Sequence, residues 1–374
     1  ALRLHAHEKE YLPVKGLFPL KEAVAGFHRQ KDLVEANADY VLVGPGSKEL
    51  MFLLQLVFYG EIIVPTPCWV SYVPQAQILG KRVSLLHTSF EDKWHIRADR
   101  LSELLEGEKD TYRPRLLVLN YPGNPDGLTY TANELKEIAE VAREYELILL
   151  SDEIYGQLHH RGGHVSVARF YPEGTIISSG LSKWCGAGGW RLGTFTFPQS
   201  QDWLMDAMAA VASETYTSVS APIQYAAIEA FRGSMVIERY LWHARRILSV
   251  LGQKCYRMLS DAGVRLHSPE GAFYMFPDFS PFAIELAKKN IKTSKQLCEK
   301  LFQETAVAML PGRVFERPCE ELTARISYIN FSGSKSLAAS ETIAIHHELP
   351  AEFIQAHCEE TLRGMEILTE WLTS

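Results

Sequence analysis

The 374-residue sequence lacks a long hydrophobic run, an excess of basic residues and a cysteine framework. No stretch approaches the roughly 18 consecutive apolar residues of a membrane-spanning helix, so we expect no membrane span. Lys and Arg total 38 against 45 Asp and Glu, and the formal charge of -7 argues against a general binder of nucleic acids or anionic membranes. The hydrophobic content of 47% excludes a disordered or fibrous chain.

Cysteine and histidine give no sign of a metal site. The six cysteines are scattered without a CxxC pair, which favours reduced thiols and a cytoplasmic protein. Two pairs of histidines are adjacent, His159–His160 and His346–His347, and neighbours on a strand point to opposite faces. We therefore expect no bound metal.

Short β-type runs alternate with longer helical patterns along the first two thirds of the chain. The expected strands are residues 40–43, 61–64, 82–86, 115–120, 146–151, 175–179 and 194–197. The expected helices between them are residues 48–58, 70–79, 132–144 and 201–211. Several strands are almost continuously apolar, which is typical of a sheet covered on both faces. This alternation predicts an α/β fold with a mainly parallel sheet.

The pattern changes near residue 265. A long helical stretch from residue 234 to about 262 ends at Gly263, and GAFYMFPDFSPF, a helix, RISYIN and a closing helix follow. A chain of this length is expected to form two domains. We predict a large domain of residues 1–264 and a smaller α+β domain of residues 265–374.

Polar motifs follow three of the expected strands, where ligands bind in open α/β sheets. They are NYPGNPDG from Asn120 to Gly127, DEIY from Asp152 to Tyr155, and Ser182-Lys183 with GWRLG after it. Taken alone, the first is better explained as a plain turn, and the second as a strand that ends at the solvent. The fragment GPGSK, residues 44–48, adds a possible phosphate seat at a helix start, although it fits neither the Walker nor the GxGxxG spacing.

Taken together, these motifs resemble those of the class I/II aminotransferases, which are pyridoxal-phosphate enzymes of fold type I. TPCWVSY, GAFYMF, MLPGRVF and RISY match the same family in the same order, from about Tyr11 onward. The resemblance implies a large domain with a mostly parallel seven-stranded sheet between helices, and a smaller C-terminal α+β domain. It also implies pyridoxal 5'-phosphate as the cofactor.

The resemblance assigns the catalytic residues. Lys183 forms the Schiff base with the cofactor and then moves the proton, for which its pKa must fall well below the free value of about 10.4. Asp152 faces the pyridine nitrogen. Tyr155 and Asn124 bind the ring 3-oxygen, and Asn120 supports the same edge.

The remaining assignments concern the ring, the phosphate and the substrate. Trp69 is expected to stack on the cofactor ring, and Arg325 to bind the substrate α-carboxylate, with Asn124 beside it. Tyr11 matches a tyrosine that reaches the phosphate of the neighbouring subunit, which implies a homodimer with shared active sites. The phosphate is expected to be held by Gly46, Ser47, Lys48, Ser182 and Arg191.

The sequence departs from the family at two places. Family members carry several dozen residues before the Tyr11 region, so we expect an N-terminal arm to be missing here, and an organelle leader stays compatible with the sequence. Gly180 stands where the family often has Ser.

Three functions are compatible with these residues. The favoured one is transfer of an amino group from an L-amino acid to a 2-oxo acid by a ping-pong cycle. A C–S lyase or an aminocyclopropanecarboxylate-synthase-like enzyme shares the same lysine, aspartate and arginine. A non-enzymatic descendant of the fold is disfavoured, because a scaffold needs none of these residues.

Overall fold

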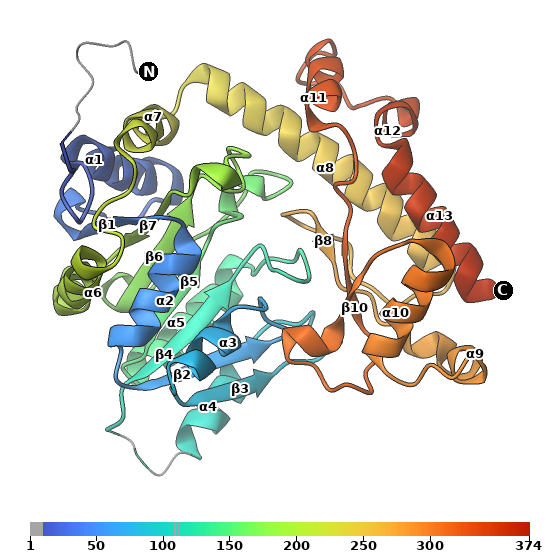
Figure 1. Ribbon diagram of the computed structural model, residues 1–374, viewed down its shortest axis with the longest axis horizontal. Coiled ribbons are helices and arrows are strands. Elements are labelled where there is room, and N and C mark those ends of the chain that lie inside the picture. The colour runs from blue at the N-terminus through green and yellow to red at the C-terminus, as the bar shows by residue number, and fades with distance from the viewer. Residues whose placement is uncertain (1–9, 108–109, 111) are drawn as a thin grey trace.

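The computed structural model describes residues 10–107, 110 and 112–374, so the expectation of a missing N-terminal arm lies outside the described residues. A seven-stranded sheet forms the centre of the N-terminal part of the chain, with the strand order β1-β7-β6-β5-β4-β2-β3 (Figure 1). The strands are β1 (Val41–Gly44), β2 (Glu61–Thr66), β3 (Val83–His87), β4 (Arg115–Asn120), β5 (Ile148–Asp152), β6 (Thr175–Gly180) and β7 (Gly193–Thr196). Every pair formed between strands β2, β3, β4, β5 and β6 is parallel. Strand β7 is antiparallel to both of its neighbours, β6 and β1. The predicted mainly parallel sheet is confirmed.

Helices cover both faces of this sheet. Alternate residues of a strand point to opposite faces, so Leu116 and Val118 of β4 pack in one hydrophobic cluster and Leu117 and Leu119 in another. The helices of the first cluster are α2 (Ser47–Val57), α3 (Tyr72–Ile78) and α6 (Asp202–Glu214). Those of the second cluster are α4 (Ala98–Glu106) and α5 (Ala132–Glu144). Burial on both faces explains the continuous apolar runs in the sequence.

The long predicted helix is α8 (Met235–Asp261), and the Ser234 side chain caps its start. At its N-terminal side, α1 (Phe18–Phe27) packs against α7 (Ala221–Arg232). Figure 1 shows α8 running from this region to the C-terminal elements. Within the described residues, none of the helices is long and apolar enough to cross a membrane.

The C-terminal elements combine helices with a small antiparallel sheet in the order β8-β10-β9. The strands are β8 (Tyr274–Met275), β9 (Leu310–Pro311) and β10 (Ala324–Ser327). The helices are α9 (Ala283–Lys288), α10 (Ser294–Thr305), α11 (Gly333–Glu341), α12 (Ala351–His357) and α13 (Glu359–Thr373). Helix α8 packs against α11, α12 and α13, and the boundary at residue 264 stays a prediction.

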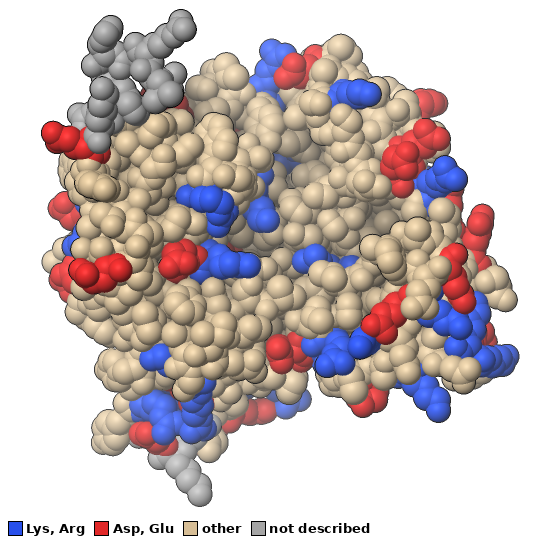
Figure 2. Space-filling model, viewed as in Figure 1, with Lys and Arg blue, Asp and Glu red and all other residues tan. Residues whose placement is uncertain are grey.

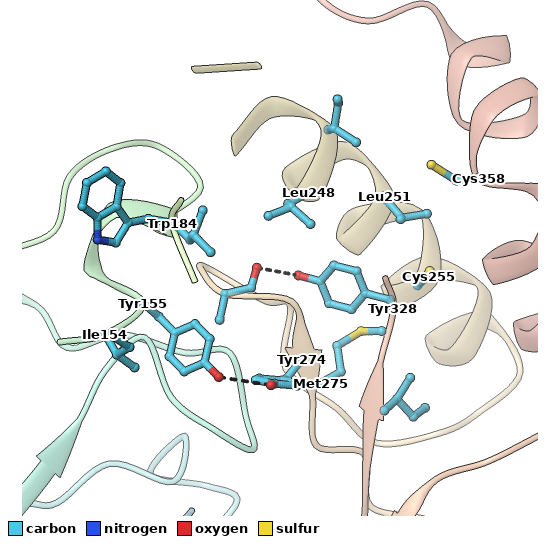
Figure 3. Packing of buried hydrophobic residues seen from close by; sticks show 14 of the residues in the cluster. Ile154, Tyr155, Trp184, Leu248, Leu251, Cys255, Tyr274, Met275, Tyr328 and Cys358 are labelled. Atoms are coloured by element: carbon cyan, nitrogen blue, oxygen red, sulfur yellow. Dashed lines mark hydrogen bonds between the residues drawn. The ribbon is translucent and has the colours of Figure 1, made fainter. Parts of the chain in front are cut away.

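One hydrophobic cluster joins the end of β5 to α8 and the small sheet. Tyr155 follows β5, Leu248 and Leu251 lie on α8, and Tyr274 belongs to β8 (Figure 3). This cluster fixes the position of the small sheet relative to the carboxyl end of β5.

Candidate active site

A cavity of about 440 Å³ lies at the carboxyl ends of the central strands. Figure 2 shows a recess near the middle of the molecule with Lys and Arg side chains at its edge. The cavity is lined by Ser47, Lys48, Trp69, Asn120, Asn124, Asp152, Ile154, Tyr155, Ser182, Lys183, Gly188 and Arg191. The fold therefore brings together most of the residues that the sequence predicted from separate motifs.

Asp152 is the last residue of β5, and its carboxylate is buried. It accepts hydrogen bonds from the Tyr72 hydroxyl at 2.7 Å and the Ser178 hydroxyl at 3.2 Å. Burial raises the pKa of Asp152 to about 6, although both hydroxyls and the nearby Lys183 charge limit the rise. Among the described residues no cation forms an ion pair with this carboxylate, which fits a ligand that brings a protonated ring nitrogen.

Lys183 follows β6, and its ammonium lies 5.5 Å above the ring centre of Tyr155. Burial lowers the pKa of Lys183, and the Asp152 charge opposes this effect. The positive charges of Arg325, Arg191 and Lys48 lower that pKa further. A larger share of neutral amine makes Lys183 a better nucleophile and base.

The turn before α2 and Arg191 form a cradle for an anion. Gly46 has a φ of 100°, and a Cβ there would lie 2.2 Å from the Arg191 guanidinium, so only glycine allows this approach. Arg191 donates to the carbonyl oxygens of Gly188 at 2.8 Å and Pro45 at 3.2 Å. Helix α2 begins at Ser47, so its N-terminal N–H groups and the Arg191 fork favour a phosphate at this end.

Arg325 lies on β10 and donates to Asn124 Oδ1 at 2.9 Å. Its guanidinium lies 4.6 Å from the ring centre of Tyr274 and 5.3 Å from that of Phe315. The buried Nε of Arg325 has no hydrogen-bond partner among the described residues. An unsatisfied buried donor costs free energy, so a carboxylate ligand fits here.

Asn120 connects two of the motifs. Its side chain accepts from the Asn124 backbone N–H and donates to the Asp152 carbonyl oxygen, each at 2.9 Å. Residues Asn120 and Asp152 are also direct partners across β4 and β5. These bonds hold the NYPGNPDG turn against the end of β5.

Trp69 and Tyr11 differ in position. Trp69 lines the cavity, with the Lys48 ammonium 5.1 Å from its ring centre. Tyr11 is 89% exposed and does not line the cavity of this chain. Its predicted contact with a neighbouring subunit stays a prediction.

Comparison with known proteins agrees with the geometry. The family model for aminotransferase class I and II matches residues 3–338. The chain belongs to this family. The aspartate aminotransferase of Bacillus sp. (strain YM-2) is 31% identical over 85% of this chain and 79% of its own length. That of Geobacillus stearothermophilus is 32% identical over 89% of this chain and 81% of its own length.

Solved structures agree with this assignment. The aspartate aminotransferase from Thermus thermophilus with maleate has a TM-score of 0.80 at 26% identity, covering 96% of this chain and 83% of that one. The aromatic aminotransferase from Pyrococcus horikoshii OT3 also scores 0.80 at 27% identity, covering 97% and 88%. The predicted fold type I is confirmed, and the protein is a pyridoxal-phosphate-dependent aminotransferase.

Ile154 and Gly188 line the cavity but were not predicted. Tyr72, Ser178 and Tyr274, which hydrogen-bond to predicted site residues, were not predicted either. Tyr72 and Tyr274 stand inside the TPCWVSY and GAFYMF motifs, which are the only sequence signal for them. Ser178 meets Asp152 because the two are partners between β5 and β6, and this register is not visible in the sequence.

A second polar cluster is built around Glu153, the residue after Asp152. Its carboxylate accepts from His164 at 2.8 Å, from Ser166 at 2.6 Å and from Ser151 at 2.8 Å. Burial alone would raise the pKa of Glu153, but the His164 charge and these hydrogen bonds lower it overall. Burial alone would lower the pKa of His164, but the Glu153 charge raises it overall.

Asp32 approaches the same cluster. One of its carboxylate oxygens lies within 4.8 Å of a carboxylate oxygen of Glu153 and of a ring nitrogen of His164. Asp32 has its own partner, His28, at 2.7 Å. The His164 ring nitrogen is aligned to donate to the Glu153 carboxylate, which is the geometry of an ion pair. The expectation of no bound metal stays a prediction.

Proposed function

We propose that the cavity holds pyridoxal phosphate on Lys183 and transfers an amino group from an L-amino acid to a 2-oxo acid. The observation that carries this proposal is the convergence of Lys183, Asp152, Tyr155 and Arg191 on one cavity. When bound, the cofactor supplies an electron sink for negative charge at the substrate Cα.

The predicted residues would then have defined tasks. Asp152 would hold the proton on the pyridine nitrogen, since its buried charge is favourable only beside a cation. Tyr155 would donate to the ring 3-oxygen, with Asn124 beside it, and Trp69 would contact the ring. The phosphate is held by Gly46, Ser47, Lys48, Ser182 and Arg191.

Lys183 and Arg325 act on the substrate. The Arg325 fork binds the α-carboxylate and thereby orients the Cα–H bond. The Lys183 amine would take the proton from the substrate Cα, and its lowered pKa favours the neutral amine that this role requires.

The cations of the site are assigned to groups that every amino-acid substrate brings or shares: Lys48 and Arg191 to the phosphate, and Arg325 to the α-carboxylate. The choice of a first substrate therefore rests on the similar proteins. Both bacterial relatives compared above are named aspartate aminotransferases. We propose aspartate with 2-oxoglutarate as the first substrate pair to test, with aromatic donors as the second.

We also propose a cytoplasmic homodimer with shared active sites. The exposure of Tyr11 leaves it free to reach a partner's phosphate, and Trp190, beside Arg191, is 51% exposed. The described cysteines are all free thiols, as is usual in a reducing compartment.

A coupled assay distinguishes transaminase activity from lyase activity. The purified holoenzyme is given each amino acid with and without a 2-oxo acid, and product is measured over many turnovers. The proposal expects product beyond one turnover only when an acceptor is present, and none from Lys183→Ala. Sustained product without an acceptor would show a lyase.

A further inference from the structure

Two tyrosine hydroxyls meet beside the cavity. Tyr155 follows β5 and Tyr274 lies on β8, 119 positions later in the chain, yet their hydroxyl oxygens are 3.1 Å apart. Both side chains are buried, and their rings meet edge to face with centres 5.7 Å apart (Figure 3). The contact therefore has a fixed geometry and links the large sheet to the small one.

The direction of this hydrogen bond follows from the proposed function, on which the inference rests. A tyrosine hydroxyl has one proton to donate and lone pairs to accept. If Tyr155 donates its proton to the cofactor 3-oxygen, its bond with Tyr274 must run the other way. Tyr274 then donates to Tyr155, and Tyr155 donates onward.

We propose that Tyr274 is a positioning residue that strengthens Tyr155 as a hydrogen-bond donor to the cofactor. Consecutive hydrogen bonds polarise one another in a buried site, so a proton donated to Tyr155 makes its own O–H a better donor. The Arg325 guanidinium, 4.6 Å from the Tyr274 ring centre, adds positive charge beside the first donor of this chain. The same arginine fixes the ring by a cation–π contact.

The consequence is measurable at the Lys183 nitrogen. A stronger donor to the 3-oxygen withdraws negative charge from it, so the cofactor-bound Lys183 nitrogen holds its proton less tightly. Loss of the Tyr274 hydroxyl should therefore raise the pKa of that nitrogen. In the cofactor-free chain the Asp152 charge raises the pKa of Lys183, and Asp152 is unchanged in the variant.

Other charged groups near Lys183 stay the same in the test. Arg325, Arg191 and Lys48 lower the pKa of Lys183 in the cofactor-free chain and are unchanged in the variant. Tyr155 keeps its proton at neutral pH, because burial raises its pKa well above the usual value.

The experiment is a pH titration of the visible absorbance of the holoenzyme in wild type and Tyr274→Phe. We expect the transition of the cofactor-bound Lys183 nitrogen to move upward by roughly 0.3 pH unit, with cofactor still bound. Tyr328→Phe is the matched control: Tyr328 is buried nearby but bonds to His160 and the Ala272 carbonyl oxygen, so no shift is expected.

A double-mutant cycle tests the route of the effect. In a Tyr155→Phe background, Tyr274→Phe should produce no further shift, because the relay has already been removed. An unchanged or lowered transition in Tyr274→Phe, or an equal shift in both backgrounds, would overturn the inference. A wild type without a cofactor band would instead reject the proposed function, so the two failures are distinguishable.

Discussion

Asp152 and Glu153 are adjacent and equally buried carboxylates with opposite surroundings. Asp152 is bound by two neutral hydroxyls, and burial raises its pKa to about 6. Glu153 is bound by His164 as well as hydroxyls, and its pKa is lowered. Glu153 is already paired within the fold, so removing its charge would leave a buried partner unpaired, whereas Asp152 is available to a cationic ligand.

The largest expected contrast comes from neutralising each carboxylate. Asp152→Asn should reduce transaminase activity by about 10²–10³-fold, because it removes the charge that holds the ring proton. Glu153→Gln should lower the free energy of unfolding by about 3–5 kcal/mol, because it leaves His164 without its counter-charge. Steady-state kinetics and urea unfolding of both variants measure the two effects.

The contrast also predicts the reciprocal results. Asp152→Asn should leave the cofactor-free protein at least as stable as wild type, and folded Glu153→Gln should keep kcat within a few-fold. If Glu153→Gln removed activity while stability was unchanged, the division between the two carboxylates would be wrong.

A pH series on the cofactor-free protein separates the two carboxylates, because their contributions to stability change in opposite directions as pH rises. The pKa of Asp152 rises on folding from 3.8 to about 6, so its contribution to stability is lost as pH rises between these values, by on the order of 3 kcal/mol. The lowered pKa of Glu153 contributes stability above the ordinary carboxyl range, which is lost in acid. The raised pKa of His164 contributes stability below the ordinary histidine range, which is lost when pH rises through the folded value.

Unfolding free energies measured across this pH range in wild type and Asp152→Asn test the assignment. The variant should lose the decline between pH 4 and about 6. A profile identical to that of wild type would contradict the raised pKa of Asp152.

Each carboxylate also accepts a hydrogen bond from a tyrosine hydroxyl, so two matched substitutions with smaller effects can be compared. Tyr72→Phe removes a 2.7 Å hydrogen bond to Asp152 and should weaken cofactor binding about 10-fold or more. Tyr121→Phe removes a longer hydrogen bond of 3.4 Å to Glu153 and also the oxygen that accepts from the Val167 N–H. This variant should lower the free energy of unfolding without changing cofactor affinity. Cofactor titration and thermal unfolding of both variants measure these effects. Equal losses of cofactor affinity in the two variants would contradict the different roles of Asp152 and Glu153.

The smallest expected effects come from the serines. Ser178→Ala removes a 3.2 Å hydrogen bond to Asp152 and should weaken cofactor binding by about five-fold, or roughly 1 kcal/mol. Ser151→Ala should lower the free energy of unfolding by about 1 kcal/mol and leave cofactor affinity unchanged. The same two measurements apply, and a reversed pattern would refute the assignment of the two clusters.

The strands of the large sheet and α8 follow from local pattern, and the structure confirms them. Motifs at strand ends predicted the lining of the cavity, because parallel strands bring their carboxyl ends to one edge. The sequence did not reveal the cluster of Asp32, Glu153 and His164, whose members come from distant segments. The contacts of Ser178 and Tyr274 likewise depend on strand register and on the packing of the two sheets.

The most direct test locates the cofactor on the chain. Purified holoenzyme is reduced with borohydride, digested, and analysed by mass spectrometry for a pyridoxyl-phosphate group on a peptide. We predict the group on Lys183, and its loss together with the visible absorbance band in Lys183→Ala. Attachment to another lysine, or no attachment in the wild type, would contradict the assignment of this cavity as the active site.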